Sequence, residues 1–181
     1  MGGNLMSGGV SPMLSKPPVG PLRFASPQPI GPWEKVGDGS KFGPTCPEIG
    51  LFGNAVRDED CLYLNVAAPK VETTELLPAM VFIHGGGFQS GCGNIYYPNY
   101  FMDENVILVT LYYRLGVLGF LNTGDTSIRG NMGLKDQALA RGWVKGNIQN
   151  FGGNPNRITI LGESAGKIMS WSKFKMNHLG A

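Results

Sequence analysis

The sequence predicts an α/β fold whose later strands pair in parallel, and three observations carry this prediction. Short apolar, β-branched runs recur along the chain, and one longer segment between them repeats its apolar residues at helical spacing. The 28 Gly and 13 Pro residues are typical of a chain rich in turns. With 42% hydrophobic and 15% charged residues, the 181-residue chain can bury the core of one ordinary domain.

Three strands are expected in the first two thirds of the chain. Residues 1–44 are rich in Gly, Pro and Ser and predict irregular connection rather than core. Leu62–Val66 alternates apolar and polar residues, Met80–Ile83 is a short apolar run followed by glycines, and Val106–Tyr113 is β-branched and aromatic. The last run is long enough for a strand buried on both faces.

A helix and a fourth strand are expected next. Apolar residues recur at steps of three to five positions between Leu134 and Phe151, which predicts a helix with one buried face. Ile158–Leu161 is the following apolar run and predicts a strand. Strands that alternate with helices pair in parallel, so this strand should join the sheet in parallel. If no further strand pairs with it, its apolar outer edge favours aggregation.

Charge and targeting signals exclude some classes of function. The net charge is +2, which argues against a nucleic-acid partner or an anionic membrane surface. No stretch approaches the roughly 18 apolar residues of a membrane span, and the N-terminus shows no signal peptide, so the compartment stays unknown. Cys46 and Cys61 can close a loop of about 15 residues, yet a disulfide there needs an oxidising compartment. Cys92 is expected to be a small buried residue.

The strand expected at Ile158–Leu161 leads directly into Gly162-Glu163-Ser164-Ala165-Gly166. Small residues two positions before and after Ser164 permit a sharp turn from strand to helix that exposes the serine hydroxyl. The backbone N–H of Ala165 then lies where it can stabilise a developing oxyanion. An ordinary turn between a strand and a helix is the alternative. The pentapeptide alone favours that alternative, and the preceding strand makes the two interpretations about equal.

A second glycine-rich segment, His84-Gly85-Gly86-Gly87-Phe88, follows the strand expected at Met80–Ile83. Consecutive glycines leave backbone N–H groups free to approach a substrate oxygen. A flexible loop and a phosphate-binding nest are the alternatives. A phosphate loop needs a following Lys-Ser/Thr, which Phe88-Gln89-Ser90 does not offer. We interpret His84 as a brace for this loop, because the catalytic histidine of this architecture follows the serine.

These segments together resemble the type-B carboxylesterase and cholinesterase family of α/β-hydrolases. The resemblance covers about residues 17 to 166 and rests on five segments in the family's order: Pro17–Phe24, Glu59–Val66, Tyr113–Gly116, Gly130–Gln137 and Phe151–Gly166. It implies a partial α/β-hydrolase fold in residues 17–166, the N-terminal part of the central sheet up to the nucleophile elbow. Residues 1–16 are then an atypical Gly/Ser-rich N-terminus, and residues 167–181 an unrelated tail.

The resemblance implies a role for each residue of the site. Ser164 is the nucleophile that attacks an ester carbonyl and forms an acyl-enzyme. Gly86, Gly87 and Ala165 supply the N–H groups of the oxyanion hole. Glu163 shapes the electrostatics beside the nucleophile, and a carboxylate that only favours the start of a helix is the alternative.

Outside the site, the resemblance implies a disulfide between Cys46 and Cys61 and a structural ion pair between Arg23 and Glu59. It assigns Asp136 to the scaffold rather than to catalysis. The partner that it implies is a small-molecule carboxylic ester, with no cofactor, no metal, no nucleic acid and no membrane.

The sequence departs from the family in the residues that would activate the serine. A serine hydrolase needs a histidine base and an acid that orients it, in the chain order Ser, acid, His. After Ser164 the sequence has no Asp or Glu and one histidine, His178, which a helix would place ~20 Å away. We therefore expect a serine carboxylesterase by family that is itself inactive. A non-catalytic cholinesterase-like adhesion or binding protein is the alternative, and a lipase or thioesterase leaves Pro17–Phe24 and Glu59–Val66 unexplained.

Overall fold

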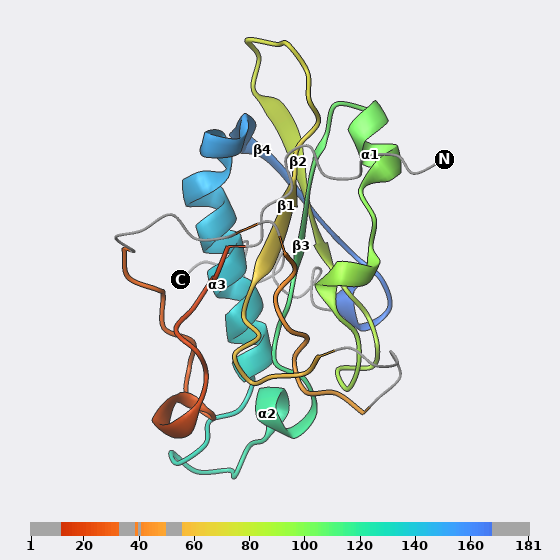
Figure 1. The fold of residues 1–181 in the computed structure, drawn as a ribbon. Helices are drawn as coiled ribbons and strands as arrows, with labels where there is room; N and C mark the ends of the chain where they lie inside the picture. The colour runs from red at the N-terminus through yellow and green to blue at the C-terminus, as the bar shows by residue number, and fades with distance from the viewer. Residues whose placement is uncertain (1–11, 33–38, 40, 50–55, 168–181) are drawn as a thin grey trace, which may run out of the picture.

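A computed structural model describes residues 12–32, 39, 41–49 and 56–167. Within these residues one sheet contains four strands: β1 (Leu64–Ala67), β2 (Leu77–Ile83), β3 (Ile107–Leu111) and β4 (Gly153–Gly162). Their order is β1-β3-β2-β4. β2 pairs in parallel with both β3 and β4, whereas β1 pairs antiparallel with β3. The predicted α/β class and the parallel placement of the last strand are confirmed (Figure 1).

One long helix covers a face of this sheet. The described helices and 3₁₀ turns are η1 (Gly20–Leu22), η2 (Gly93–Ile95), α1 (Asn99–Asp103), α2 (Gly116–Phe120), α3 (Met132–Asn147) and η3 (Ile148–Phe151). α3 is the long helix beside the sheet in Figure 1. It corresponds to the helix predicted over residues 134–151, but its last turn tightens into η3 and ends at Gly152, whose φ is +78°.

The core lies between α3 and the sheet. Ala140, Val144 and Ile148 of α3 pack in one cluster with alternating residues of the strands. All five residues of β3 are buried, so this strand is covered on both faces, as the sequence predicts. η2 lies over the second face of β3, where the Thr110 hydroxyl donates a hydrogen bond of 2.7 Å to the carbonyl of Gly93.

The strands differ from their predicted bounds, most clearly where β2 and β4 begin. β2 starts at Leu77 rather than Met80, and β4 at Gly153 rather than Ile158. The added residues pair with each other, Leu77 opposite Gly153, through an irregular register before Ala79. β4 contains Pro155, a residue that argues against a strand. Among the described residues β4 is an edge strand, and an edge strand tolerates proline because the N–H groups on its outer side form no ladder bonds.

The expectation that residues 1–44 lie outside the core is wrong for Leu14. Its side chain is 1% exposed and belongs to the main cluster. The Leu14 amide donates to the carbonyl of Leu62 at 2.9 Å, and the preceding Met13 forms an antiparallel bridge with Tyr63. Pairing with a distant segment leaves no local periodicity, so the sequence pattern does not reveal it.

Candidate active site

The two glycine-rich segments emerge side by side from neighbouring parallel strands. β2 ends at Ile83, β4 ends at Gly162, and these two residues are register partners. The amide of Glu163 continues the pairing by donating to the carbonyl of Ile83 at 3.4 Å. The loop that begins at His84 and the turn that contains Ser164 therefore start at the same edge of the sheet.

The turn at Ser164 is tight and strained. Ser164 has a φ of +51°, a left-handed conformation that residues other than glycine seldom adopt. A Cβ added to Gly162 would lie 2.3 Å from the carbonyl carbon of Gly166, and one added to Gly166 would lie 2.1 Å from the carbonyl oxygen of Ile83. Only glycine fits at these two positions. The turn leaves Ser164 exposed, and buries Ala165 directly after it.

The glycine loop touches the serine directly. A Cβ added to Gly85 would lie 3.1 Å from Cβ of Ser164 and 2.8 Å from the carbonyl oxygen of Glu163. Gly86 and Gly87 follow with φ values of +103° and +60°. The amides of Gln89 and Ser90 each donate to the carbonyl of Gly86 at 3.0 Å, which closes a compact turn. The absence of side chains at residues 85–87 is what permits this close approach.

His84 is held inside the protein by three contacts that fix the start of the loop. Its side chain packs in a stack with the ring of Tyr113, with centroids 4.3 Å apart. The Tyr113 hydroxyl donates to the carbonyl of His84 at 2.9 Å, and Nδ1 of His84 donates to the carbonyl of Gly85 at 2.9 Å. Burial lowers the pKa of His84 to about 4, so the ring is neutral at pH 7. These contacts agree with a bracing role.

Glu163 lies exposed beside the serine and contacts a tyrosine that sequence reasoning missed. Its Oε2 accepts a hydrogen bond from the Tyr96 hydroxyl at 3.3 Å. Tyr96 also packs against Phe82 of β2, with ring centroids 4.3 Å apart. Burial, and secondarily the negative charge of Glu163, raise the pKa of Tyr96. No pattern around Tyr96 in the sequence indicates this contact, which arises because the segment after the glycine loop folds back over β2.

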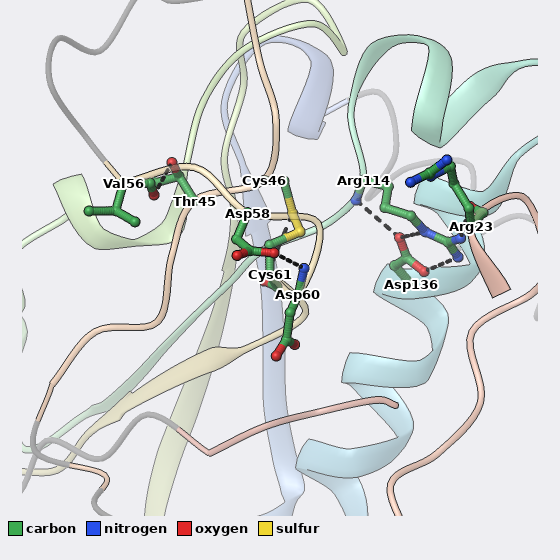
Figure 2. Close-up of a disulfide and its surroundings, with 9 residues drawn as sticks. All are labelled: Arg23, Thr45, Cys46, Val56, Asp58, Asp60, Cys61, Arg114 and Asp136. Carbon is green, nitrogen blue, oxygen red and sulfur yellow. Dashed lines mark hydrogen bonds and ion pairs between the residues drawn. A yellow bond between two sulfur atoms is a disulfide. The ribbon is translucent and has the colours of Figure 1, made fainter. Parts of the chain in front are cut away.

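The structure pairs the scaffold residues that the resemblance names. Cys46 and Cys61 form a disulfide with Cα atoms 5.0 Å apart (Figure 2). Cys92 is buried in the same cluster. Nε of Arg23 donates to Oε2 of Glu59 at 2.6 Å near the surface.

Asp136 lies away from the serine turn in a buried ion pair with Arg114. Its Oδ1 accepts from Nη2 of Arg114 at 2.7 Å, and its Oδ2 accepts from Nε at 2.9 Å (Figure 2). The pair links the start of α3 to the segment after β3. This arrangement agrees with a scaffold role for Asp136.

An open apolar groove begins at the glycine loop. It has a volume of about 850 Å³ and lies between Gly87–Gln89 and α2. Apolar side chains provide most of its wall: Phe88, Val117, Phe120, Leu121 and Leu134. Phe88 and Phe120 pack against each other at 5.3 Å between centroids, which shapes one side of the groove.

Neither a metal-binding cluster nor a membrane-spanning helix is found among the described residues. In that part of the chain, no group of three or more His, Cys, Asp or Glu side chains is arranged to hold a metal ion. None of its helices has the length and apolar character that a bilayer crossing requires. His178 lies outside the described residues.

A serine on a strained strand-to-helix turn, beside a glycine loop from the neighbouring parallel strand, is the arrangement of the α/β-hydrolase fold. A solved structure of a thermophilic PNB esterase matches it with a TM-score of 0.81 and 41% identity, over 90% of this chain and 36% of that one. The chain belongs to the carboxylesterase family, whose sequence profile matches residues 14–171.

Two similar proteins of known sequence carry esterase names. The chain is 53% identical over 158 residues to a juvenile hormone esterase of Tribolium castaneum, over 84% of this chain and 27% of that protein. It is 48% identical over 155 residues to venom carboxylesterase-6 of Apis mellifera, over 82% of this chain and 28% of that protein. The chain thus spans little more than a quarter of the length of these relatives.

Proposed function

We propose that this chain carries the nucleophile and the oxyanion hole of a serine carboxylic ester hydrolase. The observation that carries the proposal is the contact between the glycine loop and the Ser164 turn at the paired ends of β2 and β4. Ser164 Oγ attacks the ester carbonyl, the alcohol leaves, and the acyl group stays on the serine until water releases it.

The oxyanion forms between the two segments. The N–H groups of Gly86 and Gly87 approach from one side, and the N–H of Ala165 from the other. Each such donor stabilises the developing charge by about 3 kcal/mol in enzymes of this kind. The positive φ values at Gly86, Gly87 and Ser164 support this role, because they turn the backbone away from strand geometry at the points where N–H groups must converge.

The substrate is a small carboxylic ester with an apolar portion. The apolar groove beside Gly87 supports this class, because its wall offers no charged side chain among the residues that line it. The printed names of the relatives, a juvenile hormone esterase and a venom carboxylesterase, agree with esters as the substrate class.

Ser164 lacks an evident base in this chain, and we propose that turnover is accordingly weak. The sequence contains two histidines. His84 is buried, and its Nδ1 is bound to the carbonyl of Gly85. His178 follows Ser164 with no Asp or Glu between them or after them to orient it. Oxyanion stabilisation and binding alone leave at most about 10³–10⁴-fold acceleration over water.

Reaction with a fluorophosphonate probe tests the nucleophile. We expect slow labelling of Ser164, identified by peptide mass spectrometry, and turnover of a p-nitrophenyl ester no more than about 10³–10⁴-fold above the rate in water. The labelling rate should rise continuously with pH, because no neighbouring imidazole takes the hydroxyl proton. Ser164→Ala should abolish labelling, and Ser127→Ala, at an exposed serine outside the site, should not. Labelling that persists in Ser164→Ala contradicts the nucleophile, and Ser164-dependent turnover more than about 10⁴-fold above the rate in water contradicts the missing base.

A further inference from the structure

Glu48 connects the disulfide-closed segment to the glycine loop. It lies two residues after Cys46, and its side chain is 2% exposed. Its Oε1 accepts a hydrogen bond of 2.9 Å from Nη2 of Arg57, which lies near the other end of the same disulfide-closed segment, four residues before Cys61. Its Oε2 accepts from the backbone N–H of Gly91 at 3.2 Å. The Glu48 carboxylate therefore joins the two ends of that segment to each other and to the end of the glycine loop.

A second bond runs alongside this contact. The amide of Ile49 donates to the carbonyl of Gln89 at 3.3 Å. Gln89 and Ser90 in turn donate their amides to the carbonyl of Gly86, so the attachment at residues 89–91 continues into the turn that begins at Gly86.

Gly91 transmits the position of Glu48 to the start of the loop. Its φ is +111°, and an added Cβ would lie 2.4 Å from Nδ1 of His84 and 2.6 Å from the carbonyl oxygen of Gly85. The backbone of Gly91 is thus packed directly against the two residues that precede Gly86. A shift of the Gly91 amide cannot leave His84 and Gly85 in place, because close-packed atoms transmit displacement.

A buried carboxylate is costly unless its oxygens are paired, so Glu48 must keep both partners. Removing its charge weakens both bonds at once and frees the end of the loop. A carboxylate that only stabilised the disulfide-closed segment would need Arg57, but it would not need to reach Gly91.

We propose that Glu48 is a positioning residue for the oxyanion hole. Through the N–H of Gly91 it fixes the turn of residues 86–91, and with it the direction of the Gly86 and Gly87 N–H groups. The Cys46–Cys61 disulfide holds Glu48 in reach of that turn. The inference rests on the proposed function for its chemical consequence, while the mechanical link between the two segments is independent of Ser164.

Hydrogen exchange of the oxidised 181-residue chain tests the link. In Glu48→Gln, the hydrogen-bonded amides of Gln89, Ser90 and Gly91 should exchange at least about tenfold faster, because the bond from Gly91 to a charged group is weakened. Peptides from β2 and β3 should keep their rates. Glu59→Gln is the matched control, because it removes another Arg–Glu pair near the disulfide that does not touch the loop. Unchanged exchange at residues 86–91 in Glu48→Gln overturns the proposal.

Labelling by the fluorophosphonate separates positioning from mere support. The labelling rate of Ser164 should fall at least about tenfold in Glu48→Gln and stay unchanged in Glu59→Gln. Faster exchange with an unchanged labelling rate overturns the positioning role. If the wild-type serine does not react at all, the proposed function fails, and exchange alone decides whether Glu48 fixes the loop.

Two further experiments test the link if Glu48→Gln does not fold. Glu48→Asp keeps the charge but is one methylene too short to reach both partners, and it should accelerate exchange at residues 86–91 to a smaller extent. Reduction of the wild-type disulfide should accelerate exchange in the same residues before β3 is affected. Loss of protection in β3 first, or in all segments together, counts against a specific connection.

Discussion

Replacement of Asp136 by asparagine should destabilise the fold strongly, because it breaks a buried ion pair on one side only. Arg114 is 2% exposed and Asp136 is 0% exposed. The carboxylate accepts from the Arg114 backbone N–H at 3.0 Å as well as from the guanidinium. Asparagine keeps the size of the side chain but removes the charge, so the guanidinium stays buried without its counter-ion.

The expected loss is about 3–5 kcal/mol, the range for breaking a buried pair by removing one partner. Arg114 retains bonds from Nη1 to the carbonyls of Arg23 and Ala25, both 2.9 Å, which keep it from turning out to solvent. With an m value of about 2 kcal/mol per molar urea, the unfolding midpoint should fall by about 1.5–2.5 M. Tryptophan fluorescence at low protein concentration reports this transition, since Trp143 of α3 packs against Phe151 of η3.

Glu59→Gln serves as the control, because its pair with Arg23 is near the surface and solvent screens it. Its midpoint should stay close to that of the wild type. Equal midpoints for Asp136→Asn and the wild type would refute the reasoning that a buried counter-ion is required. A large loss in both variants would show that burial is not what separates the two pairs.

Three further predictions concern the glycine turn, acid stability and the open edge of the sheet. Gly166→Ala should abolish fluorophosphonate labelling and lower the Tm, because the added Cβ would lie 2.1 Å from the carbonyl oxygen of Ile83. Gly142→Ala is the control: a Cβ added at this position of α3 meets no atom within 4 Å, so the change should stabilise the fold by about 1 kcal/mol. Burial lowers the pKa of His84 from 6.5 to about 4, so the unfolded chain binds a proton at a higher pH than the folded protein does. The free energy of unfolding should therefore fall as the pH drops from 6.5 towards 4, by about 2 kcal/mol between pH 7 and 5 in urea titrations. His84→Gln should lose less stability over the same range. Thr159→Lys, at an exposed position of β4, should reduce aggregation measured by light scattering, since a charge on an apolar edge opposes strand pairing between molecules. Equal scattering from the variant and the wild type would contradict aggregation through the edge of β4.

The elements that local pattern predicts well are those whose burial is uniform along the chain. β3 is apolar throughout and is covered on both faces, so its run is visible in the sequence, although it ends at Leu111 rather than Tyr113. The first strand is displaced for a different reason. It is β1, Leu64–Ala67, rather than Leu62–Val66, because its register is set by pairing with β3 and not by its own alternation.

The contacts that shape the candidate site are long-range and carry no local signal. Tyr113 reaches the carbonyl of His84, Tyr96 reaches Glu163, and Glu48 reaches Gly91, each across a separation that no sequence window covers. Their residue types are common at surfaces and in cores alike. Their roles become visible only when the chain segments are placed in space.

The sequence by itself determined the two segments of the candidate site, because backbone geometry is local. Glycines at 162 and 166 permit the turn that exposes Ser164, and consecutive glycines after His84 permit close approach of N–H groups. Tertiary structure alone decided that these segments meet. β2 and β4 are separated in the chain by β3 and α3, and only their parallel pairing at Ile83 and Gly162 brings a serine hydroxyl beside a glycine loop.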